Sequence, residues 1–140
     1  MQHRTVCNPR NLIAVILIPL ALGCANTAEE VFVTEQPAPN EVLLHPGGAS
    51  TVLDMEIDRL ANATEVAFAE LGIALEEREV EDDGVDLSGN DGGQSVTVEI
   101  DRDDDEVMTE VDVSVTRDGI TFDSARSGEI LRRIMALARS

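Results

Sequence analysis

The hydrophobic pattern changes from one continuous apolar run to alternating and helical periods along this chain. Residues 12–22 are apolar throughout, whereas residues 94–102 and 107–116 alternate between apolar and polar side chains. Alternation at a period of two predicts half-buried strands, and the acidic residues 103–105 between them predict a turn. We therefore expect an antiparallel hairpin at residues 94–116.

Two segments carry the spacing of an amphipathic helix. Apolar residues recur on one helical face between residues 57 and 71, with Asp58 placed to cap the start and Gly72 placed to end the helix. The second segment, residues 124–138, has a similar apolar face and arginines near its end, where they suit the helix dipole. Both segments are predicted to be helices that pack by their apolar faces.

The remaining strand signals complete the predicted order of elements. Residues 51–56 alternate well and residues 73–81 alternate imperfectly, while residues 85–87 form a short apolar piece before a turn at residues 88–93. The predicted order is β-α-β-β-β-β-α. This order is typical of a two-layer α+β domain, here residues 51–140, in which helices cover one face of an antiparallel sheet.

The apolar run at residues 12–22 has the composition of a bacterial export signal. Arg4 and Arg10 give the positive start of such a signal. Crossing a bilayer core takes about 20 apolar residues, so this run is too short for a membrane span. We therefore interpret residues 1–23 as a signal peptide that is removed on export.

The residues Ala21-Leu22-Gly23-Cys24 resemble the bacterial lipobox, although Leu is more usual at the position of Ala21. The resemblance implies that Cys24 becomes the first mature residue and carries acyl chains such as palmitate. Two acyl chains are enough for stable anchoring. Ala25, rather than Asp, follows the cysteine and favours the outer membrane where one exists. The alternative is an ordinary signal peptide with a chance cysteine.

Residues 24–50 have the composition of a flexible tether between the lipid anchor and the domain. They are rich in Asn, Thr, Ala, Glu, Pro and Gly. Two short apolar pieces, residues 31–33 and 42–44, are either isolated strands or points at which the tether docks. His45 falls within this segment, outside the predicted domain.

Several short motifs within residues 51–138 keep a common order along the chain. They are Ile57-Asp58-Arg59-Leu60, Ala63-Thr64, Glu70-Leu71-Gly72-Ile73, Gly84, Val96-Thr97-Val98, Val113-Ser114-Val115, Phe122-Asp123, Ser127 and Ile130-Leu131. Together with the lipobox, they are similar to a family of small bacterial lipoproteins of unknown function. The resemblance implies a lipidated cysteine, a short linker and one small α+β domain, and it implies no activity or cofactor.

Charge is the strongest feature of the composition. Removal of Arg4 and Arg10 with the signal peptide leaves 28 acids against 8 arginines, a formal charge of −20, and the chain has no lysine. A field of this sign excludes nucleic acid as a partner and disfavours electrostatic adhesion to anionic lipid. Because salt screens such self-repulsion, we expect a halophilic or marine source. A GC-rich genome is the alternative, which explains the missing lysine but not the acids.

Acidic residues around the predicted hairpin turn have the spacing of a calcium-binding loop. Asp101, Asp103, Asp105 and Asp112 fall where such a loop places oxygen ligands. Glu106, however, occupies the position that needs Gly, and the flanking segments are predicted strands rather than helices. We interpret the segment as a solvated hairpin tip whose charges deter edge pairing, with calcium binding as the alternative.

The predicted domain lacks the combinations of residues that enzymes use for catalysis. After signal removal His45 is the only histidine, and Cys24 is expected to be blocked by lipid, so no Ser-His or Cys-His relay is predicted. The sequence has no Gly-rich phosphate loop after a strand and no cluster of His and Cys for a metal. We therefore predict no enzymatic activity and no cofactor.

These observations favour a non-catalytic lipoprotein of the bacterial envelope. Its expected role is contact with an envelope protein or the cell wall, from an exported position on the membrane. A divalent-cation-binding surface protein, with Ca²⁺ on the acidic residues, is the alternative.

The lipobox interpretation predicts that Cys24 is acylated, which can be tested directly. In cells fed a labelled fatty acid, the wild-type chain is expected to incorporate label and the Cys24→Ser variant to lose it, because the thioether that carries the lipid cannot form. Cys7→Ser is the matched control, since Cys7 lies inside the signal peptide and should not affect labelling. Label that persists in Cys24→Ser would contradict the lipobox interpretation.

Overall fold

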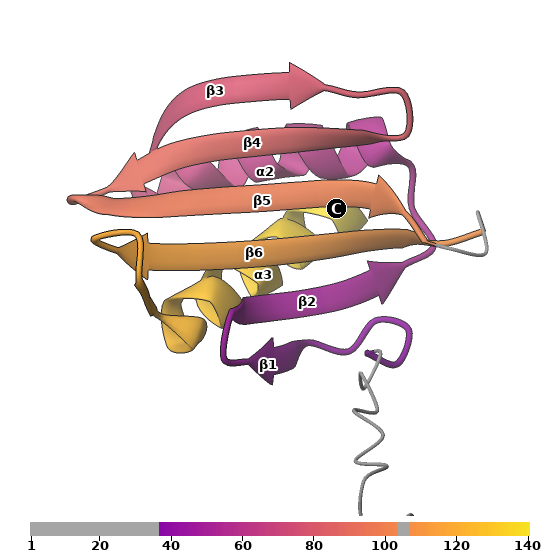
Figure 1. Cartoon of the computed structure of the whole chain (residues 1–140). Helices are drawn as coiled ribbons and strands as arrows, with labels where there is room; N and C mark the ends of the chain where they lie inside the picture. The colour runs from indigo at the N-terminus through magenta and orange to yellow at the C-terminus, as the bar shows by residue number, and fades with distance from the viewer. Residues whose placement is uncertain (1–36, 104–106) are drawn as a thin grey trace, which may run out of the picture. The chain divides into compact units, whose positions relative to one another are not determined.

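Figure 1 shows a computed structural model of the chain, which describes residues 37–103 and 107–140. The predicted signal peptide and Cys24 lie outside the described residues. The described elements are, in chain order, β1 (Leu43–His45), β2 (Gly48–Leu53), α2 (Ile57–Leu71), β3 (Ala74–Val80), β4 (Gly84–Asp91), β5 (Gln94–Arg102), β6 (Thr109–Arg117), β7 (Thr121–Phe122) and α3 (Ser124–Arg139).

The strands form one antiparallel sheet with both described helices on the same face (Figure 1). The strand order is β1-β2-β6-β5-β4-β3, and β7 pairs with the end of β6. Helix α2 packs on β3, β4 and β5, and α3 packs on β1, β2 and β6. The predicted two-layer α+β class is therefore confirmed, including the antiparallel sheet with one covered face.

The core lies between the sheet and the two helices and is almost entirely aliphatic. On the central strands, the residues that face the helices are fully or nearly fully buried: Val96, Val98, Ile100, Val111, Val113 and Val115. Leu60 and Phe68 of α2 and Ile130, Leu131 and Ile134 of α3 bury against them. Each such side chain contributes about 1.5 to 3 kcal/mol on burial. The alternation that predicted the hairpin therefore identifies the residues that hold the two layers together.

Helix ends follow the sequence signals in part. Gly72 ends α2 in the left-handed conformation, with φ of 74°, as predicted for a C-cap glycine. The predicted N-cap Asp58 instead lies in the first turn, because Glu56 occupies the N-cap position without a side-chain cap bond. At α3, the Asp123 carboxylate accepts a hydrogen bond from the backbone N–H of Arg126.

The folded part of the chain begins before residue 51, within the segment predicted to be a tether. β1 pairs with β2, and β2 pairs with β6, so residues 43–53 belong to the sheet. Two hydroxyl groups fix this segment: Thr51 Oγ1 donates to the Glu41 carbonyl at 2.6 Å, and Ser124 Oγ donates to the His45 carbonyl at 2.7 Å. The composition of the segment concealed these contacts, because its glycines and proline are typical of linkers.

The strand predicted at residues 85–87 is longer than its sequence indicates. β4 continues through Ser88–Asp91, which we predicted to be a turn, and the chain reverses at Gly92 and Gly93 with φ of 58° and 96°. Gly89 is required inside the strand because an added Cβ would lie 2.8 Å from the Ala74 carbonyl oxygen and 2.9 Å from the Phe68 ring. A glycine that serves close packing was therefore mistaken for a turn signal.

The predicted hairpin is confirmed as β5 and β6, with Val98 opposite Val113. Residues 104–106 of its turn lie outside the described residues. Among the helices that the structure describes, neither is long and apolar enough to cross a membrane.

Candidate functional site

The sheet face opposite the helices carries a concentration of carboxylates. Register and alternation place on it side chains from four neighbouring strands, which we call the acidic face: Glu77, Glu79, Asp86, Glu99, Asp101, Glu110 and Asp112. In the described strands no arginine occupies a position on this face. The same alternation that buries valine on one side therefore gathers negative charge on the other.

Four of these residues form a continuous row across the sheet. Glu79 lies opposite Asp86, Asp86 opposite Glu99, and Glu99 opposite Asp112. We call these four residues the acidic row. Like charges placed directly opposite on neighbouring strands destabilise a sheet. The row therefore opposes the folding that the aliphatic core drives.

The arginines that form ion pairs lie away from the acidic face and tie other elements together. Arg78 of β3 pairs with Glu65 of α2, and Arg133 of α3 pairs with Glu70 of α2. Arg126 of α3 pairs with Asp91 at 2.8 Å and with Glu129 at 2.7 Å, and Arg102 pairs with Glu56 at 3.5 Å. None of these carboxylates belongs to the acidic face, so the cations and the acidic row occupy separate parts of the domain.

The acidic face shifts the titration of its own carboxyl groups. Burial raises the pKa of Glu99 and of Asp101, and the neighbouring charge of Asp86 raises the pKa of both further. The charge of Asp86 is also the largest cause that raises the pKa of Glu81, just beyond β3. Each of these carboxyl groups therefore holds its proton more tightly in the folded domain than an isolated carboxyl group does.

His45 lies at one end of the acidic row, in contrast to its predicted place in a tether. Its Nε2 is 3.7 Å from Asp112 Oδ1. Burial raises the pKa of Asp112, while the charge and hydrogen bond of His45 lower it. Together with Glu99, Thr97 and Ser114, the pair lines a cavity of about 200 Å³. The prediction that His45 lies in a tether outside the domain is therefore wrong, because β1 brings it onto the sheet.

The residues predicted as weak calcium ligands are divided by the fold. Asp101 and Asp112 lie on the acidic face, on the neighbouring strands β5 and β6, while Asp103 follows the end of β5 and Asp105 lies outside the described residues. Their flanks are strands, as expected for a hairpin rather than a helix-loop-helix calcium site. Within residues 37–103 and 107–140, no group of three or more His, Cys, Asp or Glu side chains has the geometry to hold a metal ion.

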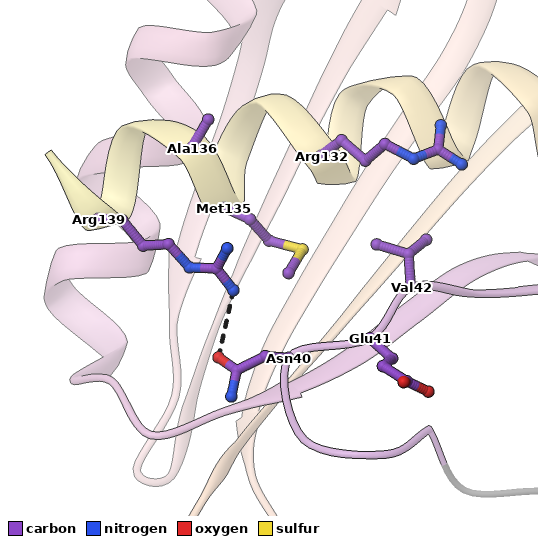
Figure 2. Close-up of a pocket in the computed structure, with 7 residues that line it drawn as sticks. All are labelled: Asn40, Glu41, Val42, Arg132, Met135, Ala136 and Arg139. Carbon is purple, nitrogen blue, oxygen red and sulfur yellow. Dashed lines mark hydrogen bonds between the residues drawn. The ribbon is translucent and has the colours of Figure 1, made fainter.

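A second cavity, of about 570 Å³, lies where residues 40–42 pass over α3 (Figure 2). Arg132 and Arg139 flank Met135 on the helix side, and Val42 lies across from them (Figure 2). Arg139 donates a hydrogen bond of 3.2 Å to Asn40 Oδ1. The cavity therefore lies along the contact between residues 40–42 and α3. This contact is on the side of the sheet away from the acidic face.

Sequence reasoning identified the excess of acids but not their arrangement. Glu99 and Asp101 alternate with buried residues of β5, and Glu110 and Asp112 do so in β6. This alternation is a sequence signal for one acidic face, because polar residues at a period of two share one side of a sheet. Asp86 likewise alternates with Val85 and Leu87, but so short a predicted segment does not fix its pairing with β5.

Comparison with known proteins gives no further guide to the site. No family model matches the chain, and no curated protein is similar to it.

The raised carboxyl pKa values predict that the domain loses stability as pH rises. Because Glu99, Asp101 and Asp112 bind protons more tightly when folded, their stabilising effect is complete below the ordinary carboxyl pKa of about 4 and is lost as pH rises through the raised values. We expect urea unfolding to give a free energy that falls as pH rises above about 4.

The variant Glu99→Gln should flatten this pH dependence, whereas Asp118→Asn, at an exposed turn away from the face, should leave it unchanged. A free energy of unfolding that instead rises with pH above about 4 would show that the acidic face does not control the pH dependence of stability.

Proposed function

We propose that this chain is a non-catalytic lipoprotein of the bacterial envelope that binds a positively charged partner protein through the acidic face. The signal peptide and lipobox of the sequence support an exported, membrane-anchored position, with the outer membrane favoured by Ala25. The anchored domain would then hold its partner close to the membrane surface.

The acidic row is the observation that carries this proposal. Strand pairing fixes the backbone positions of Asp86, Glu99 and Asp112 in line, so their charges can separate only as far as the side chains tilt. A partner that places cations over the row removes part of the repulsion, and this relief adds to the Coulomb attraction between the two surfaces. Complementary charge of this kind also accelerates association and rejects acidic competitors. Anionic polymers are repelled by the same face, so a basic protein surface fits it best.

The rigidity of the surface also suits recognition. The face consists of paired strands rather than loops, and the buried valines beneath it hold each strand in place. The backbone of such a scaffold loses little conformational freedom when a partner covers it, which lowers the cost of binding.

Chemical crosslinking in native membranes tests this proposal. We expect the wild-type chain to recover a basic protein, and the double variant Glu99→Gln/Asp112→Asn to recover at least about tenfold less, as expected when two charge contacts are lost. The matched control is Asp54→Asn/Asp118→Asn, which removes the same charge from exposed positions away from the acidic face.

Equal recovery of the partner by the acidic-face variant and the wild type would contradict the proposal. Calorimetric heat on addition of Ca²⁺, lost in the same variant and accompanied by no protein partner, would replace it with the divalent-cation alternative.

A further inference from the structure

β3 forms a long uncovered edge of the sheet next to the acidic face. It is the last strand in the order of the described sheet and pairs only with β4 (Figure 1). All of its residues, Ala74–Val80, are exposed. The backbone N–H and C=O groups on its outer side therefore offer a template on which another extended segment can pair.

The side chains of β3 present different chemistry on the two faces of the sheet. Glu77 and Glu79 lie on the acidic face, opposite Ser88 and Asp86 of β4. Val80 lies on the helix side, opposite buried Val85, and is 69% exposed although it is apolar. A segment that pairs with β3 would thus meet acids along one of its faces. Along the other it would meet Val80 and Arg78, which lies opposite Leu87 and pairs with Glu65 of α2.

The surface of α2 adds apolar area on the helix side of β3. A shallow groove of about 560 Å³ is lined by Asn62, Glu65, Val66, Ala69 and Glu70, and Val66 is 47% exposed. The ion pair between Glu65 and Arg78 joins the groove to β3. Apolar side chains of an added strand could therefore bury against α2 as well as against Val80.

The charges of β3 select against a second copy of this chain. Antiparallel pairing of two β3 edges would bring Glu77 and Glu79 of one copy close to the same residues of the other, which destabilises a sheet. A strand with basic residues at those positions instead forms opposite-charge pairs. The same side chains thus exclude self-association and favour a cationic partner, as in interfaces that use repulsion for specificity.

We propose that β3 binds an extended segment of the partner protein as an additional strand, and that this segment alternates basic with apolar residues. The inference rests on the proposed function and deepens it, because it names the mode of binding and the sequence pattern of the partner. Main-chain hydrogen bonds to β3 supply affinity, while the alternating side chains supply specificity. The basic residues extend over Glu77 and Glu79, and the apolar residues lie toward Val80 and α2.

A pair of synthetic peptides tests this mode on the full chain in detergent. In the first peptide lysine alternates with valine, and the second has the same sequence with N-methyl groups on the amides that would pair with β3. We expect the first peptide to slow hydrogen exchange of β3 amides, and the second to bind about tenfold more weakly, since a few lost backbone bonds have that effect.

Side-chain recognition is tested with variants of the chain. Glu77→Gln/Glu79→Gln is expected to weaken binding of the first peptide about tenfold, whereas Asp54→Asn/Asp118→Asn should leave it unchanged. Because these positions are exposed, the variants should fold, and the thermal unfolding of each provides the check.

Equal affinity for the two peptides, or absence of binding by both, would overturn strand addition at β3. The proposed function is tested separately from strand addition, by the acidic-face variant. Peptides that bind equally well, but lose affinity in Glu99→Gln/Asp112→Asn, would show that the acidic face recognises cations without strand pairing.

Discussion

Repulsion along the acidic row is the constraint around which this domain is built. Glu79, Asp86, Glu99 and Asp112 are held in line by the hydrogen-bonded register of four strands. Because the backbone pairing fixes their spacing, the side chains can separate only by tilting into solvent. Burial and mutual repulsion together raise the pKa of Glu99. The fold must therefore obtain its stability from the opposite face.

That opposite face is supplied by the same strands, since alternate residues of β5 and β6 are valine or isoleucine. These side chains are fully buried against α2 and α3, with Phe68 as the one fully buried aromatic ring among the described residues. Arginines add ion pairs between α2, β3 and α3 on the helix side, where they do not screen the acidic row. Stability and charge are thus segregated onto the two faces of one sheet, and the uncovered face remains available for contact.

Much of this arrangement follows from local periodicity, and the rest depends on contacts between distant residues. Both helices, the hairpin of β5 and β6 and the α+β class follow from apolar spacing in the sequence. The strand β7 does not, and the apolar residues 42–44 indicated β1 only as one of two alternatives, because each strand is short and exists through its pairing with β2 or β6. The placement of His45 beside Asp112 depends on that pairing as well, and no local signal around Pro46 indicates it. For the acidic face, the charges were evident, but bringing them to a common side required the register of strand pairing.

We propose that repulsion among the carboxylates of the acidic face limits the stability of the domain and favours recognition of a cationic partner. The most direct test is the free energy of unfolding against NaCl concentration, because near 1 M the Debye length shortens to roughly 3 Å and repulsion between neighbouring carboxylates is screened. We predict a free energy that continues to rise above about 0.5 M NaCl, with a smaller rise for Glu99→Gln/Asp112→Asn than for Asp54→Asn/Asp118→Asn. A free energy of unfolding that does not rise above that concentration, or that rises equally in both variants, would contradict this proposal.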